Sequence, residues 1–582
     1  MDDILFKARQ WGISIDQPLI IDDVDGHPWD DSADLVIVGL GGAGVAAALE
    51  GLERGIEVIA VDRYGAGGSS AANGGIYYAG GGTSIQQDAG ETDSVEEMFK
   101  YLRIEVGGVV SDETLWRFCK ESVPTMDWLI SHGVKFNSNV WKKKCSYPPL
   151  DYFLYHPDSS LAAPYARQAK PAARGHRIFV RNGKKAWGLG IGIYGPLRDA
   201  ALRLGMRFYR YAEARQIALD RNGNVVGVKV LHIPTDSAAA NRFGRSFALA
   251  SKWIAALPSS FPLAGAVYGV GRRYLKKAHA IEETYRKPRW LRARRGVILS
   301  AGGFCMNQPM IEHFAPKYGV GLPMGTLGDN GSGIILGASA GGALDHMGRI
   351  SAWRFINPPS AWVMGMLVNR KGERFVNETL YGAAIGDAIA AQDGGKAWII
   401  LDARLRRMAK EHARDPKLVP FQRDIAKLNH VFNCVKANSL DALADKIGFD
   451  QGALKRTIEE YNLAASGKQP DIYEKGAEDM AVLGEAPFYA IDASTDSKLL
   501  PMPVMSVGGL RVDERSGQVL APDGNPIGGL YAAGRNAVGI CSNIYLSGLS
   551  YADCIFSGRR VARHVAEMVD GEPCTSSTVG KP

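Results

Sequence analysis

The stretch "DLVIVGLGGAGVAAALEGLERGIEVIAVD", residues 34–62, decides the fold. Its apolar run 35–38 is typical of a buried parallel strand, and glycines follow in the spacing G-x-G-x-x-G. Small residues then recur at helical spacing, and a second strand, 57–61, leads into Asp62. Strand, glycine turn, helix, strand and terminal acid in this order predict an α/β fold with a Rossmann-type dinucleotide site.

Each residue of this motif has an expected physical role. Gly39 permits the tight turn, Gly41 lets a pyrophosphate approach the backbone, and Gly44 lets the helix pack closely on the strand. The helix N-terminus then faces the phosphates, whose negative charge it favours. Asp62 is placed to bind the hydroxyls of the adenosine ribose.

The next segment, "RYGAGGSSAANGGIYYAGGG" (63–82), is too long for a turn and too polar for a core. It is interpreted either as a flexible surface loop or as a backbone cradle along an extended cofactor, which favours FAD over NAD. Two distant apolar runs, 293–304 and 529–535, also end in glycines. We expect these strands to join the first one around a single dinucleotide.

Composition narrows the class of protein. A chain of 582 residues is too long for one core, so two or three domains are expected. Its seven cysteines are scattered, with no CxxC pair, which gives no support to a metal site and suits a cytoplasmic compartment. The N-terminus lacks the pattern of a secretory signal. No haem or iron–sulfur attachment pattern occurs, so electrons are expected to leave to a separate acceptor.

The net charge of +7 is concentrated in one segment, 271–295, which holds ten Lys/Arg and two Glu. It is a local feature, and no nucleic-acid partner is predicted. The preceding residues, 246–270, are apolar except for Lys252, and Pro258 and Pro262 argue against a spanning helix. An insertion, 246–292, is therefore interpreted as a peripheral contact with an anionic membrane, on the inner face of the cell membrane. A cover over the sheet and a subunit contact are the alternatives.

The chain resembles the flavoproteins related to fumarate reductase and the 3-ketosteroid dehydrogenases. The resemblance covers 34–82, 293–347, "NRKGERFVNETLYG" (369–382) and 501–564, in the family's order. It implies a glutathione-reductase-like FAD domain in two parts, 31–347 and 501–570. An α+β domain that caps the substrate, 348–500, would lie between them.

Departures from the fumarate reductase pattern indicate the substrate. In the segment "IYLSGLSYAD" (544–553), Tyr545 stands where those enzymes carry an arginine, and Ser547 replaces a glycine. Met505 falls where they carry a carboxylate-binding histidine. A dicarboxylate needs fixed positive charge and bidentate donors, which these side chains lack. The substrate is expected to be uncharged and apolar at its reacting end.

The pattern resembles that of the 3-ketosteroid Δ4-(5α)-dehydrogenases, which share a Tyr-x-Ser pair and a further tyrosine, matched here by Tyr381. The resemblance implies a C4–C5 double bond introduced into 3-oxo-5α-steroids. Tyr545 would stabilise the carbonyl oxygen, Ser547 would take the C4 proton, and Tyr381 would pass it toward solvent. Flavin N5 would accept the hydride from C5. The alternatives are Δ1-dehydrogenation, enone reduction, and a flavin- or steroid-binding protein without turnover.

Structural interpretations of the same residues remain open. Ser547 is interpreted alternatively as the N-cap of the following helix, a role for which Ser550 competes. Tyr545 and Tyr381 are alternatively ordinary packed tyrosines. The aromatic segment 141–168 lines a steroid cavity or packs at the surface, and the role of Arg535 is left open.

The helix that starts near Gly548 is expected to point its amides at the flavin pyrimidine edge. Asp329 is expected to fix the FAD loop, and Arg374, Asn377 and Glu378 the loop of the cap. The residues expected to bind FAD are Gly39, Gly41, Gly42, Ala43, Gly44, Asp62, Arg63, Ser69, Ser70, Ala71, Asn73, Gly74, Gly75, Ala301, Gly302, Asp329, Gly534, Leu549 and Ser550.

Overall fold

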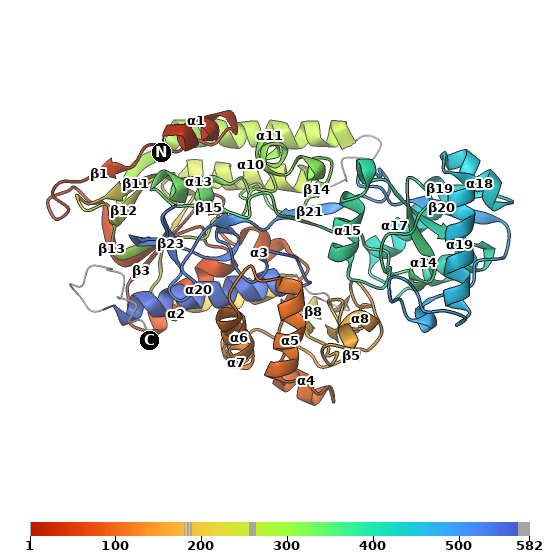
Figure 1. The fold of residues 1–582 in the computed structure, drawn as a ribbon. Helices are drawn as coiled ribbons and strands as arrows, with labels where there is room; N and C mark the ends of the chain where they lie inside the picture. The colour runs from red at the N-terminus through yellow and green to blue at the C-terminus, as the bar shows by residue number, and fades with distance from the viewer. Residues whose placement is uncertain (1, 180, 183–184, 187–188, 255–263, 569–582) are drawn as a thin grey trace.

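The computed structural model describes residues 2–179, 181–182, 185–186, 189–254 and 264–568. It has a mixed α/β body and a second, smaller unit beside it (Figure 1). The main sheet runs in the order β1-β11-β12-β13-β2-β3-β10, and β24 pairs with β13 and β23. Its strands are β1 (Leu19–Ile20), β2 (Asp31–Val38), β3 (Val58–Asp62), β10 (Arg207–Arg210), β11 (Ala212–Leu219), β12 (Val225–His232), β13 (Lys287–Leu299), β23 (Gln518–Leu520) and β24 (Pro526–Ala532).

The four predicted strands meet in this sheet. β2 pairs in parallel with β3 and with β13, and β13 pairs in parallel with β24. Leu299 at the end of β13 lies opposite Val38 of β2 and Ala532 of β24. The prediction that segments far apart in the sequence come together is confirmed.

Two hydrophobic cores cover the two faces of the sheet. Leu35 and Ile37 of β2 enter the core that holds α2 (Gly42–Glu53) and α20 (Leu549–Glu567). Val36 and Val38 enter the other core, with α1 (Asp2–Gln10), α12 (Gln308–Phe314) and α13 (Ser332–Ser339). Because successive side chains of a strand point to opposite faces, a continuous apolar run is what a sheet covered on both sides requires.

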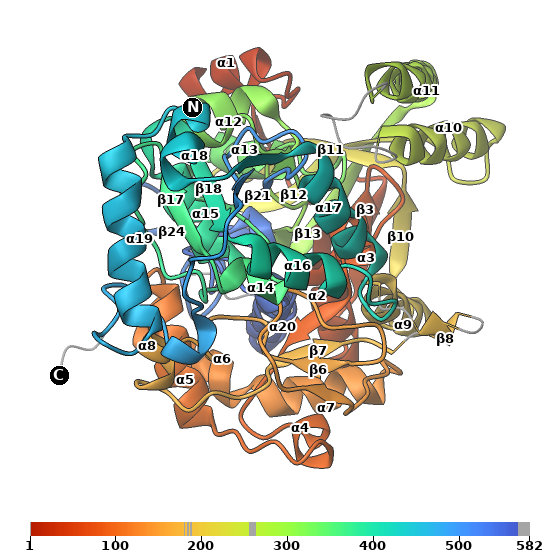
Figure 2. The same ribbon diagram turned by 90° about the vertical axis from the view of Figure 1, so that its right-hand side faces the viewer.

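A second unit has its own core, whose residues run from Ile356 to Leu500 in the sequence. Its antiparallel sheet has the order β17-β18-β20-β19. Helices surround this sheet, as Figure 2 shows from the side of the unit. The elements are β17 (Met366–Asn369), β18 (Ala397–Leu401), β19 (Cys434–Ala437), β20 (Phe488–Asp492), α14 (Ser360–Val363), α15 (Gly382–Ala390), α16 (Ala403–His412), α17 (Pro420–Phe432), α18 (Leu440–Ile447) and α19 (Gln451–Ala465).

A small sheet lies against the first turn of α20. Its order is β4-β7-β6-β5, and β4 contacts α20 directly. These strands are β4 (Ile76–Tyr78), β5 (Val140–Trp141), β6 (Leu154–Tyr155) and β7 (Gly175–Arg177). Helices α4 (Ser84–Asp88), α5 (Val95–Val106), α6 (Asp112–Lys120) and α7 (Ser122–Ser131) lie on the same side of the body (Figure 1).

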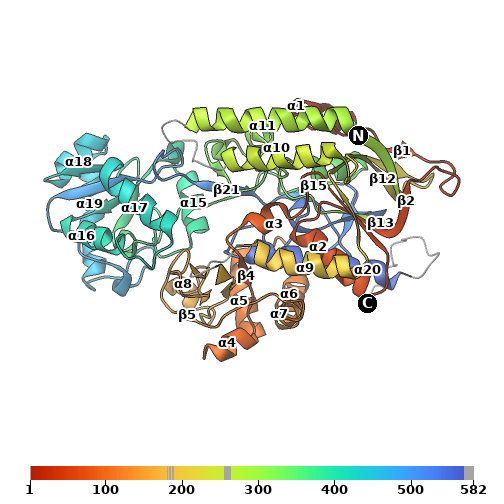
Figure 3. The ribbon, with the colours of Figure 1, turned by 180° about the vertical axis from the view of Figure 1, so that it is seen from behind.

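The predicted insertion, 246–292, overlaps a hairpin of two paired helices between β12 and β13, and its last residues, from Lys287 on, belong to β13. Helices α10 (Ala238–Ile254) and α11 (Ala264–Tyr285) lie side by side along the body (Figure 3). The apolar segment expected to begin at 246 thus continues a helix that begins at Ala238, while Pro258 and Pro262 lie outside the described residues. Among the helices in the described ranges, none is long and apolar enough to cross a membrane.

Candidate active site

A cavity of about 220 Å³ lies at the carboxyl ends of β2 and β13, beside the N-terminus of α2. This is where dinucleotides bind in sheets of this kind. The predicted cofactor residues that line it are Gly39, Gly41, Gly42, Ala43, Asp62, Ser69, Ser70, Ala301, Gly302, Asp329 and Gly534.

The remaining predicted cofactor residues do not line this cavity. Arg63 borders an adjoining cavity, but its guanidinium is ion-paired with Glu213 and Glu282. Asn73 shapes its own loop, because its side-chain oxygen accepts the Gly75 N–H at 2.8 Å. The others away from this cavity are Gly44, Ala71, Gly74, Gly75, Leu549 and Ser550.

The three motif glycines differ in what surrounds them. Gly39 has a φ of +94°, and a Cβ on Gly44 would lie 2.2 Å from the Gly39 carbonyl oxygen, so a larger residue at either position would displace the turn. A Cβ on Gly41 would meet nothing closer than the Ser70 hydroxyl, at 3.7 Å. Gly41 therefore presents open backbone to the cavity, next to the first turn of α2, where a pyrophosphate fits.

Asp62 is held by the backbone around it. Its carboxylate accepts the N–H groups of Leu40, Tyr64 and Ala66 at 3.1, 2.8 and 2.9 Å. These bonds fix the carboxylate at the edge of the cavity, and the ribose contact expected of it remains a proposal.

Arg535, whose role the sequence left open, lines this cavity, and its charge is balanced by that of Asp329. Its Nη2 donates to Asp329 at 2.5 Å, and Asp329 also accepts from the Ser69 hydroxyl and from the Thr326 N–H. Its Nη1 is buried and has no hydrogen-bond partner among the residues that the structure describes. An unpartnered buried cationic N–H, open glycine backbone and a helix N-terminus form a donor set that fits the phosphates of FAD.

The predicted catalytic hydroxyls form one cluster. Ser547 is buried, and its Oγ accepts a hydrogen bond from the Tyr155 hydroxyl at 2.9 Å. The Ser547 side chain also lies close enough to Tyr381 and Tyr545 to lower the pKa of their hydroxyls. Tyr155 comes from the small sheet, Tyr381 from the second unit, and the pair from the loop before α20. Three separate parts of the chain therefore build this group of hydroxyls.

Burial raises the pKa of the tyrosine hydroxyls of the cluster, so that they stay protonated beyond the pH at which an exposed tyrosine ionises. It raises the pKa of Tyr155 and Tyr381 well above the usual value, while the Ser547 side chain acts in the opposite direction. Burial also raises the pKa of Tyr545, against the opposing effect of the Gly548 N–H. The cluster is therefore a set of neutral hydrogen-bond donors.

The structure decides against the capping interpretation of Ser547 and Ser550. The N-cap of α20 is Gly548, in the left-handed region, and no side chain caps the helix. A Cβ on Gly548 would lie 2.7 Å from the Tyr78 nitrogen. The Tyr78 N–H also donates to the Gly548 carbonyl, so this glycine fixes the loop against β4.

Aromatic and apolar side chains enclose the cluster. Trp353 packs against Tyr545, with ring centroids 4.4 Å apart, and Phe355 packs against Tyr381 at 6.4 Å. Met505 shares the same hydrophobic core. Arg349, which reaches the Asn543 carbonyl, is neutralised by Asp387 at 3.0 Å. The surroundings suit an uncharged, apolar molecule.

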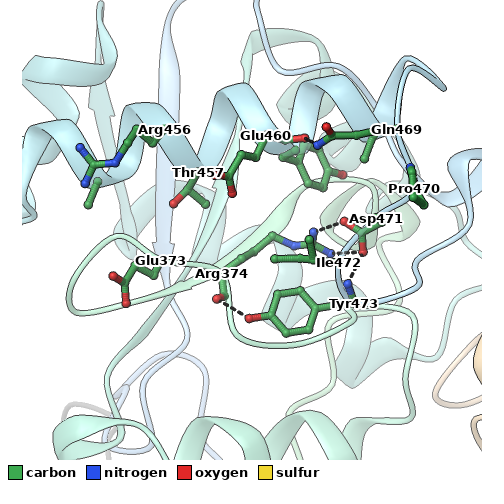
Figure 4. A pocket seen from close by; sticks show the side chains of 13 residues that line it. Glu373, Arg374, Arg456, Thr457, Glu460, Gln469, Pro470, Asp471, Ile472 and Tyr473 are labelled. Carbon is green, nitrogen blue, oxygen red and sulfur yellow. Dashed lines mark hydrogen bonds and ion pairs between the residues drawn. The ribbon is translucent and has the colours of Figure 1, made fainter.

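Another cavity, of about 360 Å³, lies elsewhere, on the second unit beside α19 (Figure 4). No predicted site residue lines it. Arg374 pairs there with Asp471 and Glu378, and the Tyr473 hydroxyl donates to the Arg374 carbonyl. Asn377 also donates to the Tyr473 carbonyl. These contacts support the structural role expected of Arg374, Asn377 and Glu378.

Comparison with known proteins agrees with this geometry. The model of the FAD binding domain family matches residues 34–548, most of the chain. The chain belongs to the FAD binding domain family. Its fold is that of the fumarate reductase and steroid dehydrogenase flavoproteins, its chemistry is that of an oxidoreductase, and its cofactor is FAD.

Three known proteins are similar to this chain over nearly their whole length. The 3-oxo-5-alpha-steroid 4-dehydrogenase of Comamonas testosteroni is 33% identical over 529 residues, which cover 89% of this chain and 96% of that protein. The crystal structure of 3-ketosteroid-delta4-(5alpha)-dehydrogenase from Rhodococcus jostii RHA1, in complex with 4-androstene-3,17-dione, is 29% identical. Its TM-score is 0.77, and the match covers 95% of this chain and all of that one. A 3-oxosteroid 1-dehydrogenase of Mycolicibacterium smegmatis is 26% identical, over 88% of this chain and 93% of that protein.

Sequence reasoning missed several residues of the two sites. Tyr155 lies in the aromatic segment 141–168, but only the pairing of β6 with β7 carries it to Ser547. Tyr64, Phe247 and Ser251 line the cofactor cavity, and the last two belong to the inserted hairpin. The aromatic content of both segments was the available signal.

Proposed function

We propose that this protein is an FAD-dependent dehydrogenase that introduces the C4–C5 double bond into 3-oxo-5α-steroids. The observation that carries the proposal is the cluster of neutral hydroxyls around Ser547, in an apolar setting where fumarate reductases need positive charge. The similarity to the enzyme of Comamonas testosteroni supports the same substrate class.

Removal of hydrogen next to a ketone requires an acceptor for the α-proton and stabilisation of the carbonyl oxygen. Tyr545, a neutral donor in a partly dry site, would bind the 3-oxo oxygen as negative charge builds on it. Ser547 would take the C4 proton as its own hydroxyl proton moves to the Tyr381 hydroxyl, which would release its proton toward solvent, because serine alone is a weak base. Tyr155, which donates to Ser547, would hold the serine in place. When bound, FAD supplies the acceptor, at N5, for the hydride that leaves C5.

A water-sized cavity beside Tyr381 supports the exit of this proton on the side of the second unit. Its volume is about 10 Å³, about one water molecule, and Tyr381, Lys144, Asp158 and Glu378 line it. The Lys144 ammonium is buried without a hydrogen-bond partner in the described chain, and burial lowers its pKa to about 7. A group with this pKa can accept and release a proton near neutral pH.

The domain arrangement that we propose follows from the separate core of the second unit. The FAD domain comprises 31–347 and 501–570, and the unit 348–500 caps the substrate and supplies Tyr381. The discontinuity is supported by the pairing of β24 with β13 inside the sheet that contains β2. Electrons would leave the reduced cofactor to a separate acceptor.

Anaerobic addition of 5α-androstane-3,17-dione to the holoprotein tests the proposed function. We expect the oxidised flavin band to bleach and the product to be the conjugated 4-ene-3-one, identified by its mass and ultraviolet absorbance. A 1-ene product would favour Δ1-dehydrogenation instead, for which the weaker similarity to 3-oxosteroid 1-dehydrogenases speaks. A shifted band without bleaching would indicate a protein that binds the steroid without turnover. Bleaching only by an electron donor that supports enone reduction would indicate that the enzyme catalyses the reverse reaction.

The outer face of the hairpin supports a further part of the proposal, peripheral contact with an anionic membrane. Leu249 and Trp253 of α10 are 38% and 37% exposed, and α11 exposes four basic residues, Arg272, Arg273, Lys276 and Lys277. Exposed apolar side chains beside basic ones suit an anionic lipid surface. The protein would then act on the cytoplasmic side of the membrane.

Vesicle sedimentation tests this contact. We expect the holoprotein to sediment with phosphatidylserine-containing vesicles and to remain in solution with pure phosphatidylcholine. Replacing the four basic residues of α11 by glutamine should abolish sedimentation while FAD content is retained. If the unaltered protein remains in the supernatant with anionic vesicles, the membrane proposal is wrong.

A further inference from the structure

The inner face of the inserted hairpin lies on the cofactor cavity. Phe243, Phe247 and Ser251 of α10 are spaced four residues apart, so they share one face of the helix. Phe243 is fully buried in a small core with Tyr211 and Ile233 of the main body, while Phe247 and Ser251 line the cavity itself. The hairpin is therefore part of the wall of the site.

The aromatic ring of Phe247 is stacked on that of Tyr64. The two ring centroids are 4.3 Å apart and the ring planes differ by 11°. Both residues line the cavity together with Asp62. The Tyr64 N–H is bonded to the Asp62 carboxylate, so the stacked pair has a fixed position beside the acid that ends β3.

The second helix of the hairpin, α11, contacts Arg63, the residue between Asp62 and Tyr64. Glu282 of α11 is buried and forms a two-point ion pair with Arg63, at 2.9 and 2.8 Å. Arg63 also pairs with Glu213 at 2.7 Å, and its guanidinium lies 5.1 Å from the centre of the Tyr64 ring. Both helices thus contact the two residues that directly follow Asp62.

The position of this wall identifies the part of FAD that it would meet. In a Rossmann-type site the acid at the end of the second strand marks the adenosine ribose, and the glycine turn marks the pyrophosphate. The stacked pair lies at the Asp62 end, so the adjacent group would be the adenine. A flat aromatic base is stabilised by contact with aromatic side chains, and Ser251 adds a hydroxyl that can bond a ring nitrogen.

We propose that the α10–α11 hairpin clamps the adenosine half of FAD, with Phe247 and Ser251 as cofactor-binding residues and Glu282 as a positioning residue that acts through Arg63. The proposal rests on FAD as the cofactor and is independent of the substrate. Because binding and ordering are reciprocal, FAD should in turn hold the hairpin against the body.

Retention of FAD by the holoprotein after dilution, followed by the recovery of free-flavin fluorescence, tests the clamp. We expect Phe247→Ala to retain FAD about ten- to a hundred-fold less well, the range measured for loss of one stacked base. Phe247→Leu keeps an apolar side chain, so misfolding would not explain its result, and it should lose FAD nearly as readily as Phe247→Ala. Phe247→Tyr should retain FAD like the unaltered protein. Leu249→Ala, on the exposed face of the same helix, is the matched control.

A second readout follows the hairpin itself. Trypsin should cut at the exposed basic residues of α11 faster after FAD is removed than in the holoprotein, and Glu282→Gln should accelerate cleavage in the holoprotein. Unchanged FAD retention in both Phe247→Ala and Phe247→Leu, or cleavage that is insensitive to FAD, would overturn the clamp. Neither measurement depends on turnover, so the steroid proposal and the clamp can fail separately.

Discussion

Replacing Ser547 by alanine is expected to lower turnover of a 3-oxo-5α-steroid by about a thousand-fold while the variant keeps its FAD. The alanine removes the hydroxyl that would take the C4 proton, and Tyr155 loses the acceptor of its 2.9 Å hydrogen bond. Tyr545→Phe should cost about a hundred- to a thousand-fold, since it removes one donor to the carbonyl oxygen. Both losses should appear as slower anaerobic flavin bleaching in stopped-flow measurements.

The matched control for these variants is Tyr473→Phe. It removes a tyrosine hydroxyl from the outer cavity of the second unit, where its partner is the Arg374 carbonyl. The control should bleach like the unaltered protein. Near-normal rates in both Ser547→Ala and Tyr545→Phe would remove the proposed mechanism, as would preferential turnover of a succinate-like diacid.

The arrangement of hydroxyls explains why the substrate class could be anticipated from so short a segment. The exchange of an arginine for Tyr545 and of a histidine for Met505 changes the charge of the site and needs no knowledge of distant contacts. The structure adds that Ser351, opposite Met505 in β16 (Ile350–Ala352) and β21 (Pro503–Ser506), accepts the Tyr545 N–H at 3.2 Å. The altered positions are therefore neighbours in space.

The dinucleotide fold could be predicted because its determinants are local. A glycine turn after an apolar strand constrains the backbone whatever lies around it, and the joining of β13 and β24 to β2 followed from their glycine ends. The contact of Tyr155 with Ser547 depends instead on long-range pairing in the small sheet, which no local pattern encodes.

The inserted hairpin is a second case in which a long-range contact could not be predicted from a local pattern. Composition drew attention to its apolar and basic residues, which mark the exposed face. The inner face differs only in the spacing of Phe243, Phe247 and Ser251, and its significance depends on a contact with Tyr64 across the fold. A helix that carries different residues on its two faces can serve two purposes. The composition of the segment does not distinguish the two faces.

Gly548→Ala is expected to abolish most activity and to lower the melting temperature by several degrees. The residue has a φ of +88°, which costs an alanine about 1–2 kcal/mol, and the added Cβ would lie 2.7 Å from the Tyr78 nitrogen. Because β4 cannot yield without disturbing the small sheet, the loop must move, and it carries Tyr545 and Ser547 away from Tyr155 and Tyr381. The variant should therefore lose the fast phase of flavin bleaching even where the flavin remains bound.

Gly223→Ala separates the two causes of this loss. Gly223, between β11 and β12, has a φ of +82° but nothing within 4 Å of an added Cβ, so it carries the backbone strain without the clash. This control should lower the melting temperature slightly and leave activity unchanged. If Gly548→Ala were no more harmful than Gly223→Ala in both measurements, the contact of Gly548 with β4 would not be what positions the catalytic loop.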